Sequence, residues 1–151
     1  MRALAVDLGS VRIGLATCDA GGVLASPYGV IPATRDRAAT RRRLAAIVAE
    51  EEIEVVVVGL PLSMDGSSGP AARAARTEAS ALAQALPVPV VLHDERLTTV
   101  TAHRLLAASG VGGRERRRVV DRAAAAVLLQ TWLEGGAPMT LIADPDGPPE
   151  E

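Results

Sequence analysis

The sequence has no phenylalanine and no lysine, and among its 151 residues it has one cysteine, one tryptophan and one tyrosine. The single cysteine, Cys18, excludes a disulfide within the chain and a zinc site built from cysteines. With so few aromatic residues, the core must consist of Ala, Val, Leu and Ile. Trp132 and Tyr28 are too few for a base-stacking platform, so recognition of nucleic-acid shape is favoured over reading of unstacked bases.

Long apolar runs are also missing. No segment approaches the roughly 20 apolar residues that span a bilayer, and the short strand after Met1-Arg2 is unlike a signal peptide. We therefore expect a cytoplasmic protein that does not contact a membrane. Residues 1–141 read as one domain, and residues 142–151, rich in proline and acidic side chains, read as a disordered tail.

The formal net charge is −2, so the chain is not basic overall, and every one of its 16 cationic residues is arginine. The arginines are unevenly spread, because Arg41–Arg43 and the run Arg114–Arg122 hold half of them. A locally basic surface that contacts phosphates is therefore compatible with the acidic composition.

Blocks of valine alternate with segments rich in Ala, Arg and Glu, which predicts an α/β fold. Strands are expected at 2–7, 13–18, 23–31, 54–59 and 88–93. Helices are expected from Thr34 or Asp36 to about Glu51, at 70–86, from Thr98 or Thr99 to about Gly110, and at 119–134. Turns at Ser10-Val11 and Asp19–Gly22 make the first three strands antiparallel, and Pro27 places the third at an edge. The two later strands then join through parallel βαβ crossovers, giving a five-stranded mixed sheet with helices on its faces.

Three acidic residues lie where apolar segments meet other elements. Asp7 ends the first strand, Glu95 follows the last strand, and Asp121 is expected in the first turn of the last helix. Three carboxylates at one sheet edge would repel one another strongly without a cation, so they indicate hard divalent metal ions. Because neighbouring strand residues face opposite sides, one of Asp94 and Glu95 joins Asp7; we choose Glu95, and expect Asp94 to pair with an arginine or cap a turn.

Several other segments are candidates for contact with a phosphate. A backbone without side-chain bulk follows Asp7, the glycine-rich loop 60–69 lies beyond a central strand, and arginines cluster near Asp121. The alternatives are an ordinary long turn for the loop, neutralisation of the nearby acids by Arg96, and a solvated mobile loop for the run 114–118. We assign no catalytic role to His93 or His103. The candidate substrate-binding residues are Gly9, Ser10, Arg12, Ser63, Asp65, Arg96, Arg114, Arg116, Arg117, Arg118 and Arg122.

Four motifs, in order along roughly residues 1–141, resemble the YqgF/RuvX family. They are Asp7-Leu8-Gly9 with Arg12-Ile13-Gly14-Leu15-Ala16, the segment Gly-Leu-Pro-Leu-Ser-Met-Asp-Gly at 59–66, His93-Asp94-Glu95-Arg96-Leu97-Thr98-Thr99, and Val120-Asp121 followed by alanines. The resemblance implies a fold similar to ribonuclease H and the RuvC resolvases. It also implies that Asp7, Glu95 and Asp121 are the three acidic active-site residues.

The resemblance implies a nuclease that uses Mg²⁺ or Mn²⁺, with two ions roughly 4 Å apart held by Asp7, Glu95 and Asp121. The family carries the labels pre-16S rRNA nuclease and Holliday junction resolvase. The resemblance points to maturation of the 5′ end of 16S rRNA, so the expected partner is structured RNA of a ribosome precursor, or branched DNA. Resolution of a junction needs two symmetric cuts and hence a homodimer. A non-catalytic nucleic-acid-binding or nucleotide-binding module is the remaining alternative.

Overall fold

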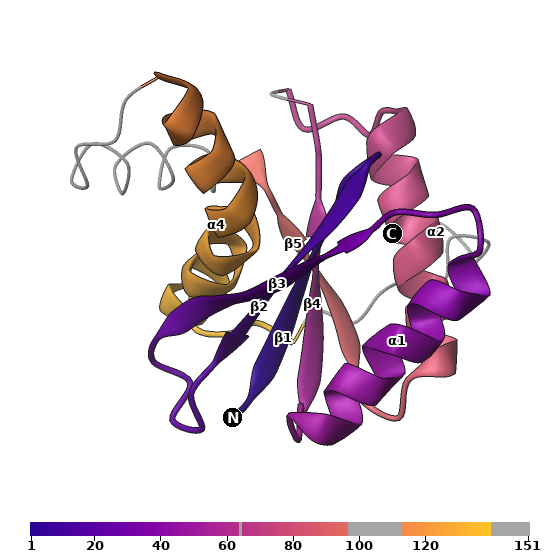
Figure 1. Ribbon diagram of the computed structural model, residues 1–151, viewed down its shortest axis with the longest axis vertical. Coiled ribbons are helices and arrows are strands. Elements are labelled where there is room, and N and C mark those ends of the chain that lie inside the picture. The colour runs from indigo at the N-terminus through magenta and orange to yellow at the C-terminus, as the bar shows by residue number, and fades with distance from the viewer. Residues whose placement is uncertain (64, 97–112, 140–151) are drawn as a thin grey trace.

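The computed structural model describes residues 1–63, 65–96 and 113–139, and for residues 113–122 it describes the backbone alone. Its described elements follow the expected alternation of strands and helices (Figure 1). None of the described helices is long and apolar enough to cross a membrane. In chain order the elements are β1 (Ala3–Leu8), β2 (Arg12–Cys18), β3 (Ala25–Pro32), α1 (Arg37–Glu50), β4 (Val55–Leu60), α2 (Pro70–Ala85), β5 (Val90–Asp94) and α4 (Gly113–Glu134).

The strands form one mixed sheet in the order β3-β2-β1-β4-β5. β1 pairs antiparallel with β2, and β2 pairs antiparallel with β3. The pairs β1–β4 and β4–β5 are parallel, which confirms the predicted crossovers. β3, which contains Pro27, lies at an edge as expected, where a missing backbone N–H disturbs no further strand.

The turns of the antiparallel part have local causes. The backbone N–H of Gly9 donates to the carbonyl of Arg12 at 2.9 Å, which closes the β1–β2 turn. In the next connection the N–H of Gly22 donates to the carbonyl of Asp19 at 2.9 Å, and Gly22 has a positive φ of 67°. The carboxylate of Asp19 accepts from the backbone N–H of Val23 at 2.8 Å and fixes the chain that leads into β3.

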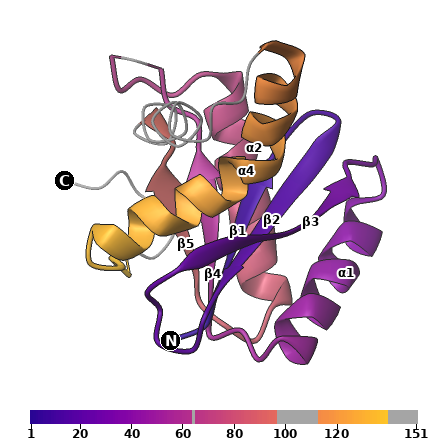
Figure 2. The same ribbon diagram turned by 60° about the vertical axis from the view of Figure 1, so that its left-hand side comes forward.

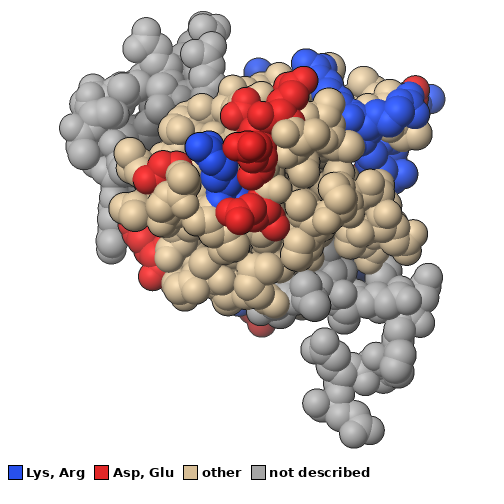
Figure 3. Space-filling view, turned by 90° about the horizontal axis from the view of Figure 1, so that it is seen from below, with Lys and Arg blue, Asp and Glu red and all other residues tan. Residues whose placement is uncertain are grey.

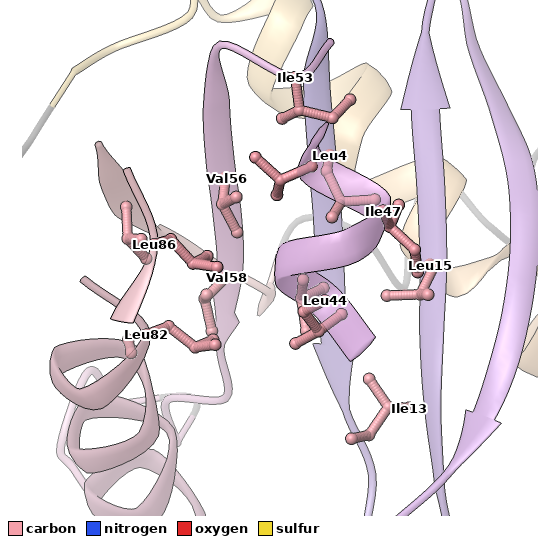
Figure 4. Close-up of a cluster of buried hydrophobic side chains, with 14 of the residues drawn as sticks. Leu4, Ile13, Leu15, Leu44, Ile47, Ile53, Val56, Val58, Leu82 and Leu86 are labelled. Atoms are coloured by element: carbon pink, nitrogen blue, oxygen red, sulfur yellow. The ribbon is translucent and has the colours of Figure 1, made fainter. Parts of the chain in front are cut away.

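One face of the sheet is covered by α1 and α2. Its buried side chains are large and branched, and they interlock with leucines and isoleucines of the two helices (Figure 4). The cluster includes Leu4, Val6, Ile13, Leu15, Leu44, Ile47, Val56, Val58, Leu82 and Leu86. Leu4 and Val6 alternate along β1 with residues that face the other way, as the period of a strand requires.

The opposite face is covered by α4, so helices lie on both faces as predicted (Figure 2). The strand residues here are mostly small, among them Ala3, Ala5 and Ala16, and they meet Ala125 and the fully buried Trp132 of α4. Small residues on both sides let the helix lie close to the sheet. The indole N–H of Trp132 is satisfied by the carbonyl of Pro138 at 3.0 Å.

The start of α4 differs most from the sequence-based expectation. α4 begins at Gly113 and not at Val119, so the arginine run 114–118 is helical and its interpretation as a mobile loop is wrong. Asp121 consequently lies well inside the helix and not in its first turn. At α1, Asp36 and not Thr34 is the N-cap, and its carboxylate accepts from the N–H of Ala39 at 3.0 Å. The helix expected before Gly110 and the tail 142–151 lie outside the described residues.

Replacing Trp132 with alanine should be strongly destabilising, because it empties the centre of the α4 side of the core. We expect a loss of about 3–5 kcal/mol in the free energy of unfolding. Urea denaturation followed by circular dichroism measures it. Tyr28→Ala, at a partly exposed position, is the control, and equal losses for the two variants would contradict this account of the core.

Candidate active site

The parallel strands β1, β4 and β5 end at the same edge of the sheet. Strand alternation places Asp7 two residues beyond Ala5 on the α4 face, and Gly59 and His93 two residues beyond Val57 and Val91 on the same face. Gly59 and His93 are paired in register across β4 and β5. Asp7, Gly59 and His93 therefore lie in a row across the three neighbouring strands at this edge.

Glu95 follows β5 and folds back over β4. A methyl group added at Gly59 would lie 2.7 Å from Cδ and 2.9 Å from Cγ of Glu95, so the side chain occupies the space that this glycine leaves. The backbone N–H of Glu95 donates to the carbonyl of Leu60 at 3.0 Å and fixes the start of this turn. From this position the Glu95 carboxyl hydrogen-bonds to Asp7.

The two acids are electrostatically linked. Burial, followed by the hydrogen bond and the charge of Asp7, raises the pKa of Glu95 from 4.5 to about 8. In the absence of a cation the pair therefore retains a proton at neutral pH. A divalent ion can replace that proton, because it neutralises both carboxylates and accepts oxygen ligands. These two residues thus fit the metal site that the sequence predicts.

Asp94 faces away from this pair and binds Arg96. Its carboxylate accepts from Nε of Arg96 at 2.8 Å and from Nη2 at 2.6 Å, and also from the backbone N–H of Arg96 at 2.9 Å. The hydrogen bonds from Arg96 lower the pKa of Asp94. Of the two interpretations left open for Arg96, neutralisation of an acid is therefore observed in the structure.

The loop between β4 and α2 is shaped by its own hydrogen bonds. The carboxylate of Asp65 accepts from the N–H of Ser67 at 2.9 Å and from its hydroxyl at 2.6 Å, and these bonds lower the pKa of Asp65. The N–H of Gly66, at φ 86°, donates to the carbonyl of Ser63 at 2.8 Å. Nη1 of Arg96 lies 3.5 Å from the position that a Cβ of Gly66 would take, so the loop reaches the Arg96 side of the site.

The β1–β2 turn lies next to Asp7. A Cβ at Gly9 would clash with the carbonyl oxygen of Arg12, so the turn requires glycine here. Ser10 and Arg12 are exposed at the same end of the sheet. Their expected contact with substrate stays a prediction.

The third expected acid, Asp121, belongs to α4, but its side chain lies outside the described residues. The same holds for Arg114, Arg116, Arg117, Arg118 and Arg122. On the helix Asp121 is one turn before Ala125, which is buried against the sheet, so its backbone position is on the sheet-facing side. Among the described side chains two acids meet at the edge, and no group of three metal-binding residues is present.

Two positions in the row were not identified from the sequence as parts of a site. Gly59 makes room for Glu95, and the Nε2 atom of His93 is buried without a hydrogen-bond partner among the described residues. Burial lowers the pKa of His93, which favours a neutral imidazole. The alternation Val91, His93, Glu95 carried the signal that all three share one face.

Sequence comparison agrees with the motifs. A model of the RuvX family, described as Holliday junction resolvase, matches residues 1–135. The chain belongs to the RuvX family. Among curated relatives, a protein of Streptomyces coelicolor is 52% identical over 134 residues, covering 88% of this chain and 80% of its own length. One of Kineococcus radiotolerans is 48% identical over 149 residues, covering 95% and 79%. Both bear the name "Putative pre-16S rRNA nuclease".

Solved structures resemble this RuvX chain in fold. RuvC of Thermus thermophilus, solved in complex with a Holliday junction substrate, has a TM-score of 0.65 and 16% identity, covering 94% of this chain and 98% of its own. A fowlpox virus Holliday junction resolvase has a TM-score of 0.51 and 13% identity, covering 89% and 99%. The ribonuclease H-like fold expected from the sequence is thereby confirmed.

The raised pKa of Glu95 makes the stability of this RuvX protein depend on pH. Between about pH 4.5 and 8 the metal-free folded chain holds a proton that the unfolded chain releases, so the free energy of unfolding falls as pH rises. Glu95→Gln should remove the part of this decline that comes from Glu95. It should also raise Tm at pH 8, by about 2–4 °C for each kcal/mol gained in the free energy of unfolding. Thermal melts in EDTA across this range measure it. Glu52→Gln, at an exposed turn, is the control, and parallel curves for wild type and Glu95→Gln would contradict the prediction.

A methyl group at position 59 should separate the two acids. Gly59→Ala pushes the flexible Glu95 side chain out of its place, so we expect the pKa of Glu95 to fall from about 8 towards 4.5. Carboxyl carbon shifts in an NMR titration report this value. Gly29→Ala, at a strand position with open space around it, should leave the titration unchanged; an unchanged Glu95 pKa in Gly59→Ala would show that the glycine does not hold the pair together.

Proposed function

We propose that this RuvX protein is a divalent-metal-dependent nuclease that hydrolyses a phosphodiester of the 16S rRNA precursor during ribosome biogenesis. The observation that carries the proposal is the hydrogen-bonded pair of Glu95 and Asp7 at the sheet edge. Relatives about half identical to this chain bear a name with that activity, which supports the choice of substrate. Such a substrate places the protein in the cytoplasm.

The protein supplies ligands for the metal ion and a surface for the nucleic-acid strand. Asp7 and Glu95 would hold the cation on the α4 face, and Asp121 would add a carboxylate from α4. Mg²⁺ or Mn²⁺, in one or two copies, supplies Lewis-acid stabilisation of the charge that develops on the phosphate and its leaving oxygen. The turn Gly9-Ser10 offers a backbone that a phosphate can approach closely, and Arg12 lies next to it. The nucleic-acid strand would be flanked by two groups of residues. They are the arginines of α4 (Arg114, Arg116, Arg117, Arg118 and Arg122) and Ser63 and Asp65 of the loop.

The charge distribution supports approach from this edge. Arginines of the described segments at this end include Arg12, Arg35, Arg73 and Arg96. At the other end, where β1 and β4 begin, the chain carries the acidic run 50–54, and Figure 3 shows acidic side chains gathered on that end. The acidic end therefore repels a polyanion, which favours approach from the edge that holds Asp7.

Resolution of a four-way DNA junction is the second candidate. The family description and the fold of Thermus RuvC favour it. The same carboxylates would serve, but two symmetric cuts require a homodimer. Parallel assays on precursor 16S rRNA and on a synthetic junction, with the mass in solution measured under the same conditions, separate the two substrates.

Asp7→Asn should lower precursor cleavage by at least about a thousandfold and leave the fold intact, because it removes one charged ligand and none of the core. It should also abolish the rise in Tm that Mg²⁺ or Mn²⁺ gives the wild type, a readout that needs no turnover. Glu52→Gln, in an exposed turn at the opposite end of the sheet, is the control for loss of one carboxylate. Full activity and an unchanged metal-induced shift in Asp7→Asn would refute the assignment.

A further inference from the structure

A cleft of about 630 Å³ opens between α1 and α2, on the face of the sheet opposite Asp7. Leu8 lines it, and in β1 Leu8 faces α1 and α2 while its neighbour Asp7 faces α4. Gly9 and Ser10 form another part of its wall, and Pro61, at the start of the loop after β4, forms a third. The cleft is therefore continuous with both segments that border the candidate active site.

Much of the cleft lining is apolar. Leu8, Ile13, Leu44 and Leu82 form its base, and α2 contributes three alanines along one side: Ala71, Ala74 and Ala75. Ala71 and Ala74 are exposed although they line a hollow, so the cleft is open and not filled by neighbouring side chains. A wall of methyl groups beside branched side chains accepts a flat ring on its face.

The rim of the cleft is cationic around one buried acid. Glu78 is 6% exposed and is held by Arg41, whose Nε and Nη2 each lie 2.9 Å from its carboxylate. Nη1 of Arg37 donates to the same carboxylate at 3.3 Å. Arg35 and Arg37 both line the cleft, so arginine charge exceeds the single carboxylate. Of the nitrogen atoms of Arg37, only Nη1 hydrogen-bonds to Glu78 in the described part of the chain, so this exposed guanidinium keeps further N–H donors for an anion.

We propose that this cleft receives an unpaired nucleotide of the strand that is cut at Asp7 and Glu95. The inference rests on the nuclease function proposed above. A nucleotide combines the two properties that the lining matches: the base offers a flat apolar face, and the phosphate offers a charge for Arg35 and Arg37. The volume lies within the range of small-ligand sites. Because the cleft and the acids are on opposite faces of β1, the strand would cross the Gly9-Ser10 turn between them.

This assignment defines a substrate class. A base can enter the cleft only after it leaves the helical stack, which costs least where the nucleotide is already single-stranded or bulged. Trp132 is fully buried, so it provides no exposed stacking surface, and the apolar cleft would take that part instead. The cut would therefore lie next to an unpaired nucleotide, and a continuous duplex would be a poor substrate.

The test narrows the cleft with one substitution. Ala74→Leu places a larger side chain into the cleft from an exposed helical position, and Ala83→Leu makes the same change on the exposed part of α2 outside it. Alanine and leucine are both strong helix formers, so both variants should melt as the wild type does. Binding is measured in EDTA by fluorescence anisotropy, with a synthetic RNA that spans the 5′ end of 16S rRNA in its precursor. In a set of these RNAs, 2-aminopurine replaces successive unpaired bases, and its fluorescence reports which base changes its environment on binding.

We expect Ala74→Leu to weaken binding of this RNA at least about tenfold, the size of effect that a blocked apolar pocket gives, and Ala83→Leu to leave it unchanged. At the position where 2-aminopurine brightens on binding, an abasic residue should weaken binding to the wild type by a similar factor. The same abasic RNA should bind Ala74→Leu no more weakly than the intact RNA does. Arg35→Gln should reduce the salt dependence of binding, relative to the exposed control Arg42→Gln.

Each of the other experimental outcomes contradicts a specific part of the proposal. Equal affinities of wild type and Ala74→Leu, or additive effects of the abasic residue and the variant, would overturn the cleft proposal even if the wild type cleaves the precursor. Free AMP that binds as tightly as the RNA and is blocked by Ala74→Leu would also overturn it, in favour of a free nucleotide. A wild type that neither binds nor cleaves this precursor RNA would refute the proposed action on the 16S rRNA precursor itself.

Discussion

The contact between Glu95 and Asp7 sets a constraint that the surrounding structure has to satisfy. Two carboxyl groups remain adjacent only if they share a proton or a cation. The contact needs β1 and β5 to end at the same edge with one strand between them, and it needs that strand to carry no side chain at the crossing point. Parallel pairing of β1, β4 and β5 supplies the first condition, and Gly59 supplies the second. A proton held at neutral pH marks the place where a cation fits.

The two faces of β1 divide the work of the chain. Ala3 and Ala5 are small, so α4 approaches the sheet closely on their side and Asp7 ends beneath that helix. Leu4 and Val6 are large, so the other side forms a thicker core under α1 and α2. The thicker layer leaves space at its end, between the helices, for the cleft. β1 thus presents the carboxylate of Asp7 on one face, and its next residue, Leu8, lines the apolar cleft on the other face.

Most of the fold could be predicted because its signals are local. Gly9 and the glycines of the Asp19–Gly22 turn permit tight turns, and Pro27 and Pro70 restrict the backbone. Continuous apolar runs identify the central strands. The start of α4 was missed for a physical reason: Gly113 and the arginines that follow show no apolar period, and a glycine-rich connector before a charged run resembles a loop. Alternation was enough to choose Glu95 over Asp94. The position of Glu95 above Gly59 was not predictable, since it depends on the register of β4 against β5. Nor was the cleft, which depends on how α1 meets α2 through Glu78 and Arg41.

The net charge of this chain gives little information about its ligand, because charge acts through its position. Screening in physiological salt limits the reach of a charge to about 8 Å, so the far acidic end hardly weakens the field at the site. What a phosphate meets is the local balance: Asp94 holds Arg96, and Glu78 holds Arg41 and Arg37. These acids orient the arginines that they bind, and Arg12 and Arg35, at the same end, take no part in these three ion pairs. The acidic composition is therefore compatible with a polyanionic substrate. The ion pairs fix where the guanidinium groups stand, and those groups then define the path that a strand can follow.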